Sequence, residues 1–465
     1  MQSGHSIWLP ELDAKDKPVY LAIADTIADD IRDGRLAPGQ RLPPQRALAE
    51  QLGLDLTTVT RAYSEARRRG LLDARVGQGT FVRMPTLTER TDDVGNAFID
   101  MTMNQPPLPH SPELLERVRQ SMVQAVSQTD ARSILRYPEI GGSLKGRSAG
   151  AQWLAQRLPD VAADRIVICP GTQSALLTLL SMLARSGDIV CAEALSYPGF
   201  KAIARQFGLR VVGVAMDDQG LDPDALRAAV VEHAPKAIYC TPTLHNPTTA
   251  TMPLKRRQEI AAIAREHRVP IIEDDIYGVL PTTSDPPIAT FAPDVTFYVG
   301  GLAKSVSPGL RIAYVAAPDA RQAMRLLGAQ RATALAMPPM LAALATQWIK
   351  DGTAGLLLDA IRTEATARQG LALDALPPGT FAAHPEGFHL WLLLPPPWTR
   401  GEFATHLRTR GVAAVVSDTF SVAGPVPEAL RICLGAASSR AETGRLLDIL
   451  ANALDQGPAL AGVVV

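Results

Sequence analysis

The chain has 465 residues, which is room for about three units, each large enough to bury a core of its own. Its composition, with 46% hydrophobic and 20% charged residues, excludes collagen, coiled coils and wholesale disorder. Lysine and arginine total 46 against 47 aspartates and glutamates, so the net charge of -1 commits the whole chain neither to nucleic acid nor to a membrane. Any basic surface must therefore be local.

Four cysteines lie far apart without the Cys-x-x-Cys spacing of a zinc site, and they suggest no disulfide framework. The first residues lack the basic and apolar regions of a secretory signal, and no apolar run approaches the roughly 18 residues of a membrane span. We therefore expect a cytoplasmic protein without a structural metal and without a membrane partner.

The N-terminal residues differ from the rest of the chain in charge and in helix pattern. Residues 1–40 hold four basic and seven acidic side chains, whereas residues 41–83 hold eight arginines and four acids. Apolar residues at helical spacing predict three short amphipathic helices. These residues are Ile23, Ile27 and Ile31, then Ala47, Leu48 and Leu52, then Val59, Tyr63 and Ala66.

The third of these helices can be capped by Asp55 or Thr57. Behind it, residues 71–72 and 80–82 flank a turn that contains glycines, which predicts a hairpin. Three helices followed by a hairpin predict a winged helix-turn-helix (α+β) DNA-binding domain over residues 1–84.

Residues 85–97 have no apolar period and predict a polar linker. Beyond them, short apolar runs alternate with helical patterns, which predicts an α/β domain with a mostly parallel sheet covered on both faces. We expect this domain over residues 98–465, with a large part at 98–335 and a smaller C-terminal lobe at 338–465. The expected strands lie at 165–169, 188–192, 209–214, 237–241, 269–273, 295–299 and 312–315.

A helix that enters the major groove needs side chains that reach base edges and neighbours that neutralise phosphates. The basic segment offers both, which makes a double-stranded DNA operator the expected partner. The alternative, a merely solvated basic face, fits the context of three helices and a hairpin less well. The candidate DNA-binding residues are Arg41, Arg46, Thr57, Thr58, Thr60, Arg61, Arg75, Gly77 and Gly79.

Three segments of this domain occur in a characteristic order. They are Arg35-Leu-Ala-Pro-Gly-Gln-Arg-Leu-Pro-Pro-Gln-Arg46, Leu56-Thr-Thr-Val59 and Gly77-Gln-Gly-Thr-Phe-Val82. Together they resemble the winged-helix domain of the GntR family, which implies DNA binding. Many relatives place an arginine before the paired threonines to read a guanine, whereas this chain has Leu56, so the base preference does not carry over.

A second group of candidate residues lies in the larger domain. Lys304 follows the run Val299-Gly-Gly-Leu-Ala303, and Arg311 lies seven residues further on. A lysine in such a setting is positioned for a lowered pKa and for Schiff-base formation. Upstream, a strand ends at Asp274, and carboxylates at the carboxyl end of a parallel strand lie where open α/β sheets bind ligands. Taken alone, Asp274 could instead be the cap of the next helix.

Two loops complete the pattern. Pro170-Gly-Thr-Gln-Ser174 joins a strand to a helix and can point N–H groups and hydroxyls at a phosphate. Pro242-Thr-Leu-His-Asn-Pro-Thr248 follows another strand. Together with Lys304 and Asp274, and in this order, these motifs resemble the aspartate aminotransferase superfamily over roughly residues 98–460, which implies pyridoxal 5'-phosphate (PLP) as the cofactor.

The resemblance implies a role for each matching residue. Lys304 is similar to the lysine that binds the cofactor covalently, and Asp274 to the acid that keeps the pyridine nitrogen protonated. Tyr277, the third expected catalytic residue, and Asn246 match groups that hydrogen-bond the ring oxygen. Tyr197 matches the aromatic residue that stacks on the ring.

The remaining matches concern the phosphate and the amino compound. Thr172, Gln173 and Arg311 match phosphate-binding positions, and Tyr137 matches a residue that reaches the phosphate of the partner subunit. Arg431 is similar to the arginine that grips an amino-acid carboxylate with its bidentate fork.

The chain departs from the superfamily pattern at two places. Gly301 and Ala303 precede Lys304, and Gly301 stands where a serine commonly contacts the phosphate. A usual glycine-containing segment reads Met101-Thr-Met-Asn-Gln-Pro-Pro107 instead. We therefore expect weaker phosphate affinity and an altered substrate side of the pocket.

A GntR-like head, a short linker and an aminotransferase-like domain in one chain resemble the MocR subfamily of bacterial transcription regulators. The resemblance implies a homodimer in which PLP and an amino acid or amine effector bias the placement of the DNA-binding heads. Two alternatives stay open. One is an active transaminase of an α-amino acid that carries a DNA-binding head, and the other is a ligand-independent DNA binder that uses the large domain only for dimerisation.

Overall fold

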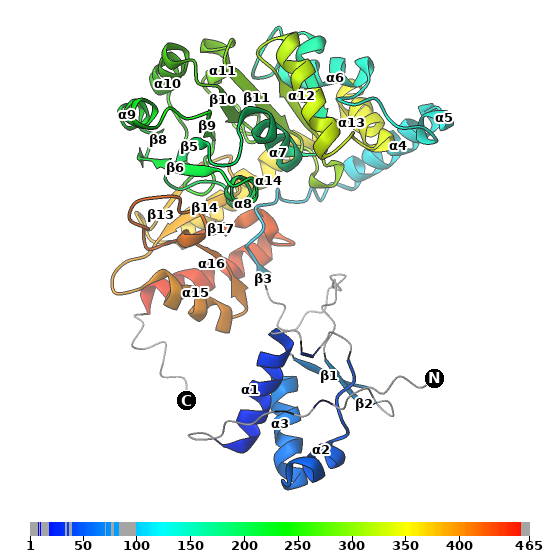
Figure 1. Ribbon diagram of the computed structural model, residues 1–465, viewed down its shortest axis with the longest axis vertical. Coiled ribbons are helices and arrows are strands. Elements are labelled where there is room, and N and C mark those ends of the chain that lie inside the picture. The colour runs from blue at the N-terminus through cyan, green and yellow to red at the C-terminus, as the bar shows by residue number, and fades with distance from the viewer. Residues whose placement is uncertain are drawn as a thin grey trace. The chain divides into compact units, whose positions relative to one another are not determined.

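The computed structural model describes residues 8, 10, 18–32, 35–36, 40–69, 71–75, 79–82 and 99–456. The chain divides into two compact units, Met1–Gly95 and Asn96–Val465, which are described separately (Figure 1). The linker expected at residues 85–97 lies outside the described residues.

The N-terminal unit, hereafter the head, contains the expected three helices and hairpin. They are α1 (Val19–Arg32), α2 (Gln45–Leu52), α3 (Leu56–Arg68), β1 (Leu72–Arg75) and β2 (Gly79–Val82), and the two strands are antiparallel. Ile23, Leu48 and Tyr63 of the three helices are fully buried in one shared core. Gly53 ends α2 in the left-handed region, with a φ of 63° that favours glycine. The predicted winged helix-turn-helix is confirmed.

The C-terminal unit is built on a sheet of seven strands in the order β4-β12-β11-β10-β9-β5-β6. The strands are β4 (Ile166–Cys169), β5 (Ile189–Glu193), β6 (Arg210–Val214), β9 (Ala237–Cys240), β10 (Ile271–Asp274), β11 (Thr296–Gly301) and β12 (Ala313–Ala316). Neighbours run parallel except at β12, which is antiparallel to β4 and to β11. The expected mostly parallel sheet is confirmed.

The reversed direction of β12 follows from its short connection. Only residues 302–312 join β11 to β12, and a parallel crossover needs about a dozen residues or more, usually with a helix. Because β12 is reversed, its first residues lie at the edge where β11 ends. Lys304 and Arg311 of the connecting loop are therefore held near that same edge.

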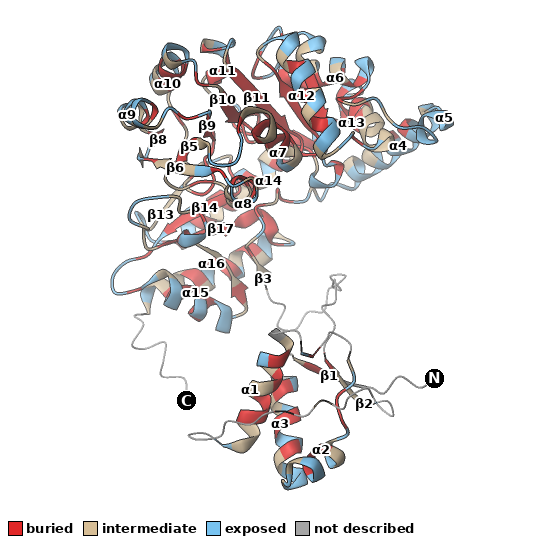
Figure 2. Ribbon diagram, in the orientation of Figure 1, coloured by how far each residue is buried: buried red, intermediate tan, exposed pale blue. Residues whose placement is uncertain are grey.

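Helices cover both faces of the sheet, as expected. Tyr239, Ile272 and Phe297 face a core shared with α7 and α8, whereas the alternating residues Ile238 and Ile271 face a core shared with α9 and α10. Figure 2 shows that buried residues concentrate in the strands and on the helix sides that face them. The helices of this layered part are α6 (Leu144–Leu154), α7 (Thr172–Leu183), α8 (Pro198–Gln206), α9 (Pro223–His233), α10 (Leu254–His267), α11 (Ile288–Phe291) and α12 (Ala320–Thr333).

The C-terminal lobe contains a second sheet with the order β13-β14-β17-β16. Its strands and helices are β13 (Phe381–Ala383), β14 (His389–Leu393), β16 (Val415–Val416), β17 (Ala429–Cys433), α15 (Arg400–Thr409) and α16 (Arg440–Asp455). The long α14 (Thr353–Ala375) packs against α16, and α4 (Pro112–Gln128), α5 (Ala131–Ile134) and α13 (Pro339–Lys350) complete the helices. None of the described helices is both long and apolar enough to cross a membrane.

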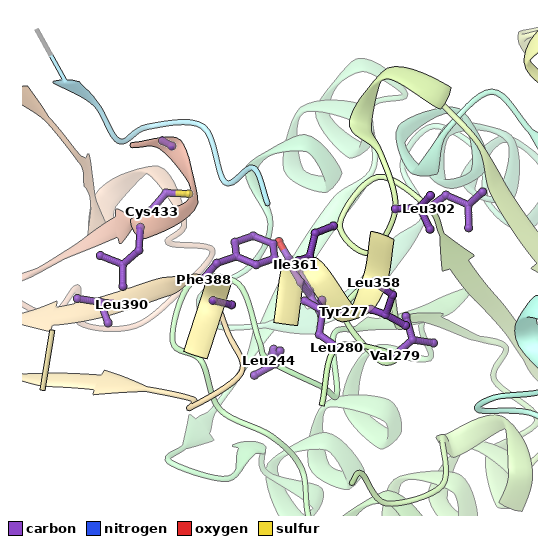
Figure 3. Packing of buried hydrophobic residues seen from close by; sticks show 14 of the residues in the cluster. Leu244, Tyr277, Val279, Leu280, Leu302, Leu358, Ile361, Phe388, Leu390 and Cys433 are labelled. Carbon is purple, nitrogen blue, oxygen red and sulfur yellow. The ribbon is translucent and has the colours of Figure 1, made fainter. Parts of the chain in front are cut away.

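The two lobes share a core and a strand pairing. Tyr277 of the large lobe lies near Phe388, with ring centroids 6.1 Å apart, and Figure 3 shows both beside residues of α14. The first strand of the C-terminal unit, β3 (Ile99–Asp100), pairs in parallel with β15 (Val412–Ala413) of the C-terminal lobe. The chain segment behind the linker, which we expected in the large part, thus joins the small lobe. A strand of two residues has no period from which this partner could be read.

Candidate functional site

The expected cofactor residues meet at the carboxyl edge of the large sheet. Asp274 is the last residue of β10, Gly301 is the last residue of β11, and Gly171 follows β4. These strands point the same way, since β10 and β11 are parallel and both β4 and β11 oppose β12. This edge is where open α/β sheets bind ligands.

Lys304 lies in the loop behind β11, and its Nζ donates a hydrogen bond to the backbone carbonyl of Asn104. Burial lowers the pKa of the Lys304 ammonium to about 8. A larger share of neutral amine at neutral pH is what covalent bonding to an aldehyde requires.

Asp274 is buried and carries one occupied and one open carboxylate oxygen. Its Oδ2 accepts a hydrogen bond of 2.9 Å from the Tyr239 hydroxyl, whereas its Oδ1 is buried and has no partner in the described part of the chain. Burial raises the pKa of Asp274 to about 7. An open, buried carboxylate oxygen fits an acid that binds a protonated pyridine nitrogen.

Tyr277 and Asn246 are both buried and are joined to other residues of the site. The Tyr277 hydroxyl accepts a hydrogen bond of 2.9 Å from Asn104 Nδ2. Asn246 Oδ1 accepts one of 2.8 Å from Arg431 Nη1, and Arg431 Nη2 donates to the carbonyl of Thr102. The segment that departs from the superfamily pattern thus lines the site.

The N-terminus of α7 has the features of a phosphate cradle. Gly171 has a φ of 84°, and a Cβ there would lie 3.2 Å from Arg311 Nη2. The hydroxyls of Thr172 and Ser174 are buried without a partner among the described residues. Open hydroxyls, an arginine and a helix N-terminus suit a phosphate group. The residues present therefore fit both ends of PLP.

Gly301 is explained by the hydroxyl of Thr172. A Cβ at residue 301 would lie 2.6 Å from Thr172 Oγ1, closer than real Cβ contacts. The threonine hydroxyl thus occupies the space in which a serine side chain at residue 301 would stand. A hydroxyl is therefore still present at this place. It belongs to Thr172, which follows β4, and not to the residue that ends β11.

Tyr197 lies at the start of α8, next to the phosphate cradle. Its hydroxyl is 3.2 Å from Gln173 Nε2, which donates to it. Its ring is folded over Gly199, where a Cβ would lie 2.4 Å from Tyr197 Cε1. Tyr197 and Gln173 are thus brought to the other predicted residues.

Tyr137 is not brought to this site. It is 91% exposed and lines a cavity of about 410 Å³ between the region of α4 to α6 and α13. Its predicted role belongs to a partner subunit, so its position apart from this chain's own site accords with that prediction without testing it.

The sequence analysis missed Tyr239 as a member of the site and gave Asn104 no specific role. Tyr239 lies inside the apolar run of β9 and has the pattern of a core residue, with its ring stacked on Phe200 at a centroid distance of 4.0 Å. One feature could have indicated its role: Tyr239 places a phenol hydroxyl on a strand next to the strand that ends in Asp274. The segment of Asn104 was expected to alter the substrate side of the pocket, but the contact of Asn104 with Tyr277 was not predicted.

The head carries a separate candidate site, a cavity of about 370 Å³ between the starts of α2 and α3 and strand β2. It is lined by Arg41, Leu42, Pro44, Gln45, Arg46, Leu56, Gly79 and Thr80. Arg41 and Arg46 are exposed, and the Arg41 guanidinium lies against Gly79, where a Cβ would be 2.9 Å from its Nε. The structure thus brings Arg41, Arg46 and Gly79 together.

The other predicted DNA residues are placed differently. Thr57 Oγ1 donates to Asp55 Oδ1 (2.6 Å), and Thr60 Oγ1 donates to Gln45 Oε1 (2.9 Å), while Thr58 is half-buried. The Arg61 guanidinium lies 4.3 Å from the centre of the Tyr20 ring on α1, away from the cavity. Gly77 and the Arg75 side chain lie outside the described residues.

The fold and the two sites define a DNA-binding head joined to an aminotransferase-type domain. Residues 96–450 match the family described as aminotransferase class I and II, and residues 19–82 match the bacterial regulatory proteins of the gntR family. The chain belongs to the aminotransferase class I and II family and carries a gntR-family head. This membership indicates PLP as the cofactor, as expected.

Several curated relatives align with most of this chain. The HTH-type transcriptional regulator YdeF of Bacillus subtilis is 30% identical over 453 residues, which cover 96% of this chain and 97% of the relative. TauR of Rhodobacter capsulatus is 29% identical and covers 67% of this chain and 70% of its own length. The probable rhizopine catabolism regulatory protein MocR of Rhizobium meliloti is 25% identical, with shares of 65% and 66%. The resemblance to MocR-type regulators is thereby confirmed.

Solved structures share the fold of the C-terminal unit. The α-aminoadipate aminotransferase LysN of Thermus thermophilus has a TM-score of 0.69 at 24% identity and covers 77% of this chain and 92% of its own. The kynurenine aminotransferase of Pyrococcus horikoshii has a TM-score of 0.69 at 22% identity, with shares of 77% and 91%. The family matches and the curated relatives together identify the chain as a gntR-type DNA-binding transcription regulator fused to an aminotransferase-like domain.

Proposed function

We propose that the protein is a homodimeric transcription regulator in which an amino acid or amine, bound at PLP, changes the affinity of the heads for operator DNA. One observation carries the proposal. A chain with a DNA-binding head also keeps the full set of groups that fit PLP, namely Lys304 with a lowered pKa, Asp274 with an open oxygen, and the cradle at Gly171–Thr172. A domain used only for dimerisation would not need these groups.

Each group has a distinct task in this proposal. PLP supplies an aldehyde that bonds to amines and a ring that withdraws electrons. Lys304 provides the amine that holds the cofactor covalently, and Asp274 Oδ1 binds the ring nitrogen and favours its protonated form. Thr172 and Arg311 would hold the phosphate through a hydroxyl and a guanidinium, and Tyr277 and Asn246 would hydrogen-bond the ring oxygen.

The effector side is formed by Arg431, which favours an effector with a carboxylate. The Arg431 guanidinium is buried, lies 5.2 Å from the centre of the Phe420 ring, and keeps Nε without a partner among the described residues. A buried guanidinium is a strong, directional site for a carboxylate. These features support an α-amino acid more than a simple amine.

The homodimer is supported by an exposed apolar face on the segment from α4 to the start of α6. Leu135 is 84% exposed there, and exposed apolar side chains that gather on one segment are typical of an interaction surface. The face comprises Leu115, Met122, Val123, Val126, Ile134, Leu135, Tyr137 and Leu144. Tyr137 on this face would reach the cofactor of the partner. A dimer that binds operator DNA acts in the cytoplasm.

The proposal is tested with the full-length protein loaded with PLP. Absorption spectra recorded with a panel of amino acids and amines should show one class that changes the cofactor band, and that class should change DNA affinity. Lys304→Ala should lose the cofactor band and the response together. By linkage, DNA must change effector affinity by the same factor.

Two outcomes would favour the alternatives. Fast multiple turnover with a 2-oxo acid, together with identical effector titrations with and without DNA, would indicate a transaminase with a DNA-binding head. Unchanged spectra with every compound and unchanged DNA affinity after removal of PLP would indicate a ligand-independent DNA binder.

A further inference from the structure

Leu56 is an apolar side chain in a place that is otherwise polar. It is the first residue of α3, directly behind the cap Asp55, whose side chain accepts a hydrogen bond from Thr57 N. Within the described part of the head, Leu56 is the only large apolar side chain that is exposed, at 38%. Leu54, two residues earlier, packs against the core of the head, but Leu56 does not belong to that core. Packing inside the head therefore does not account for a leucine at this position.

The surroundings of Leu56 indicate contact with DNA bases. The first residues of a recognition helix are those that reach base edges in the major groove. Leu56 lines the same cavity as the exposed Arg41 and Arg46, which carry charges suited to phosphates on either side. A leucine has no hydrogen-bonding group, so only an apolar feature of a base can be its partner. In the major groove that feature is the 5-methyl group of thymine.

The neighbour Gln45 adds a hydrogen-bonding preference. Gln45 Oε1 lies 2.9 Å from Thr60 Oγ1, and the single hydrogen of this hydroxyl is shared with the Leu56 carbonyl at 2.8 Å. When Thr60 donates to Gln45, the amide N–H groups are the side of Gln45 left to face DNA. Thymine presents the acceptor O4 beside its methyl group, whereas cytosine presents a donor at this place and would be repelled, even when methylated. An apolar contact next to an N–H donor therefore matches thymine among the four bases.

We propose that Leu56 determines operator specificity by contacting the 5-methyl group of a thymine, with Gln45 donating to O4 of the same base. The proposal rests on the DNA-binding function of the head. It replaces the arginine-to-guanine contact of many relatives by a thymine contact in this chain.

The test uses the consensus duplex that the full-length, PLP-loaded protein selects from random DNA. Each thymine is replaced in turn by deoxyuridine, which removes only the methyl group. At one position per half-site we expect binding to weaken about fourfold, the equivalent of about 0.8 kcal/mol for one buried methyl group. Leu56→Ala should bind the thymine and uracil duplexes equally, and Leu56→Arg should select guanine at that position.

Arg46→Ala is the matched control, because it should weaken binding to both duplexes and keep the ratio between them. Thermal unfolding of each variant shows that the head is intact. A methyl-sensitive thymine that stays sensitive in Leu56→Ala, or a consensus without any methyl-sensitive thymine, would overturn the proposal while the regulator function stands. A selection that returns no consensus would overturn both.

Discussion

At the scale of single residues, the pKa of Asp274 depends on a neighbour on β9. The Tyr239 hydroxyl donates to Asp274 Oδ2 and stabilises the ionised carboxylate against the effect of burial. A hydrogen bond to a charged group contributes about 1.5–3 kcal/mol. We therefore expect Tyr239→Phe to weaken PLP binding by about tenfold or more, measured by fluorescence titration of the cofactor-free protein.

Tyr298→Phe is the control for this prediction. Its hydroxyl donates a bond of the same length, 2.9 Å, to Asp275 Oδ2, the neighbouring acid. The control removes one buried phenol hydroxyl without touching Asp274. Equal PLP affinities of the two variants would show that Tyr239 acts only through general packing.

Asp274 also makes the stability of the cofactor-free protein depend on pH. Its pKa of about 7 in the folded chain exceeds the value of about 3.9 in an unfolded chain. The stabilising contribution of the protonated form is therefore complete below about pH 4 and is lost as the pH rises through 7. Asp274→Asn, which cannot ionise, should gain melting temperature over the native protein between pH 5 and pH 8. A constant difference between the two melting curves would contradict the shifted pKa.

A substitution at Gly301 should have an effect on stability and PLP binding that a second substitution at Thr172 reverses in part. In Gly301→Ser the new Cβ would press on Thr172 Oγ1, and overpacking of this kind costs about 1–3 kcal/mol. We expect lower stability and weaker PLP binding. In the double variant Gly301→Ser with Thr172→Ala, both should recover in part, because the contact with Thr172 Oγ1 is gone and a hydroxyl remains, while Ile276 Cγ2 still lies 3.1 Å from the new Cβ. Urea unfolding and cofactor titration of Gly301→Ser, Thr172→Ala and the double variant measure this. Additive losses in the double variant would refute the exchange of hydroxyls.

At the scale of elements, the start of α3 depends on its cap. Asp55→Ala removes the acceptor for Thr57 N and should destabilise the first turn of α3 by about 1 kcal/mol. Faster hydrogen exchange of the first amides of α3 measures the effect. Asp55→Ser keeps a capping oxygen and should retain most of the protection. Unchanged exchange in Asp55→Ala would mean that tertiary contacts alone hold this turn.

The elements also show what the sequence can and cannot predict. The apolar period of Ile23, Ile27 and Ile31 and that of Val59, Tyr63 and Ala66 predicted helices where α1 and α3 are observed, because an amphipathic stripe is a strong local signal. The direction of β12 was not predicted, since it depends on the length of a connection and not on the strand itself. Arg61 was expected near DNA, but its stacking on Tyr20 is a tertiary contact between α1 and α3 that no local pattern contains.

The same distinction holds inside the site. Lys304, Asp274 and Arg311 could be predicted because each lies in a recognisable motif at a strand end. The contact of Tyr239 with Asp274 could not, because Tyr239 has the pattern of a core residue of a strand. The segment of Asn104 was expected at the pocket, but its hydrogen bond to Tyr277 was not, because the two residues are far apart in the sequence. Their roles depend on which strands are neighbours, and that order is a property of the folded sheet.

At the scale of the whole molecule, the apolar face around Leu135 predicts the effect of dimerisation on DNA binding. Leu135→Asp places a charge on the proposed interface and should yield monomers, detected by light scattering. DNA affinity should fall by about 100-fold or more, because two linked heads bind with high effective concentration. Val231→Asp alters an exposed apolar residue of α9, away from this face, and should stay dimeric. A dimeric Leu135→Asp protein would place the interface elsewhere.

The segment behind the linker has a consequence for the energetics of the whole chain. Directly after β3, the carbonyls of Thr102 and Asn104 accept hydrogen bonds from Arg431 and Lys304. An N–H group engaged by a ligand carboxylate or by a cofactor is no longer available to these carbonyls. A ligand that engages these N–H groups therefore competes with the segment for the same two cations. The free energy of ligand binding and the free energy that anchors the chain next to the linker are therefore coupled, because both depend on the same N–H groups.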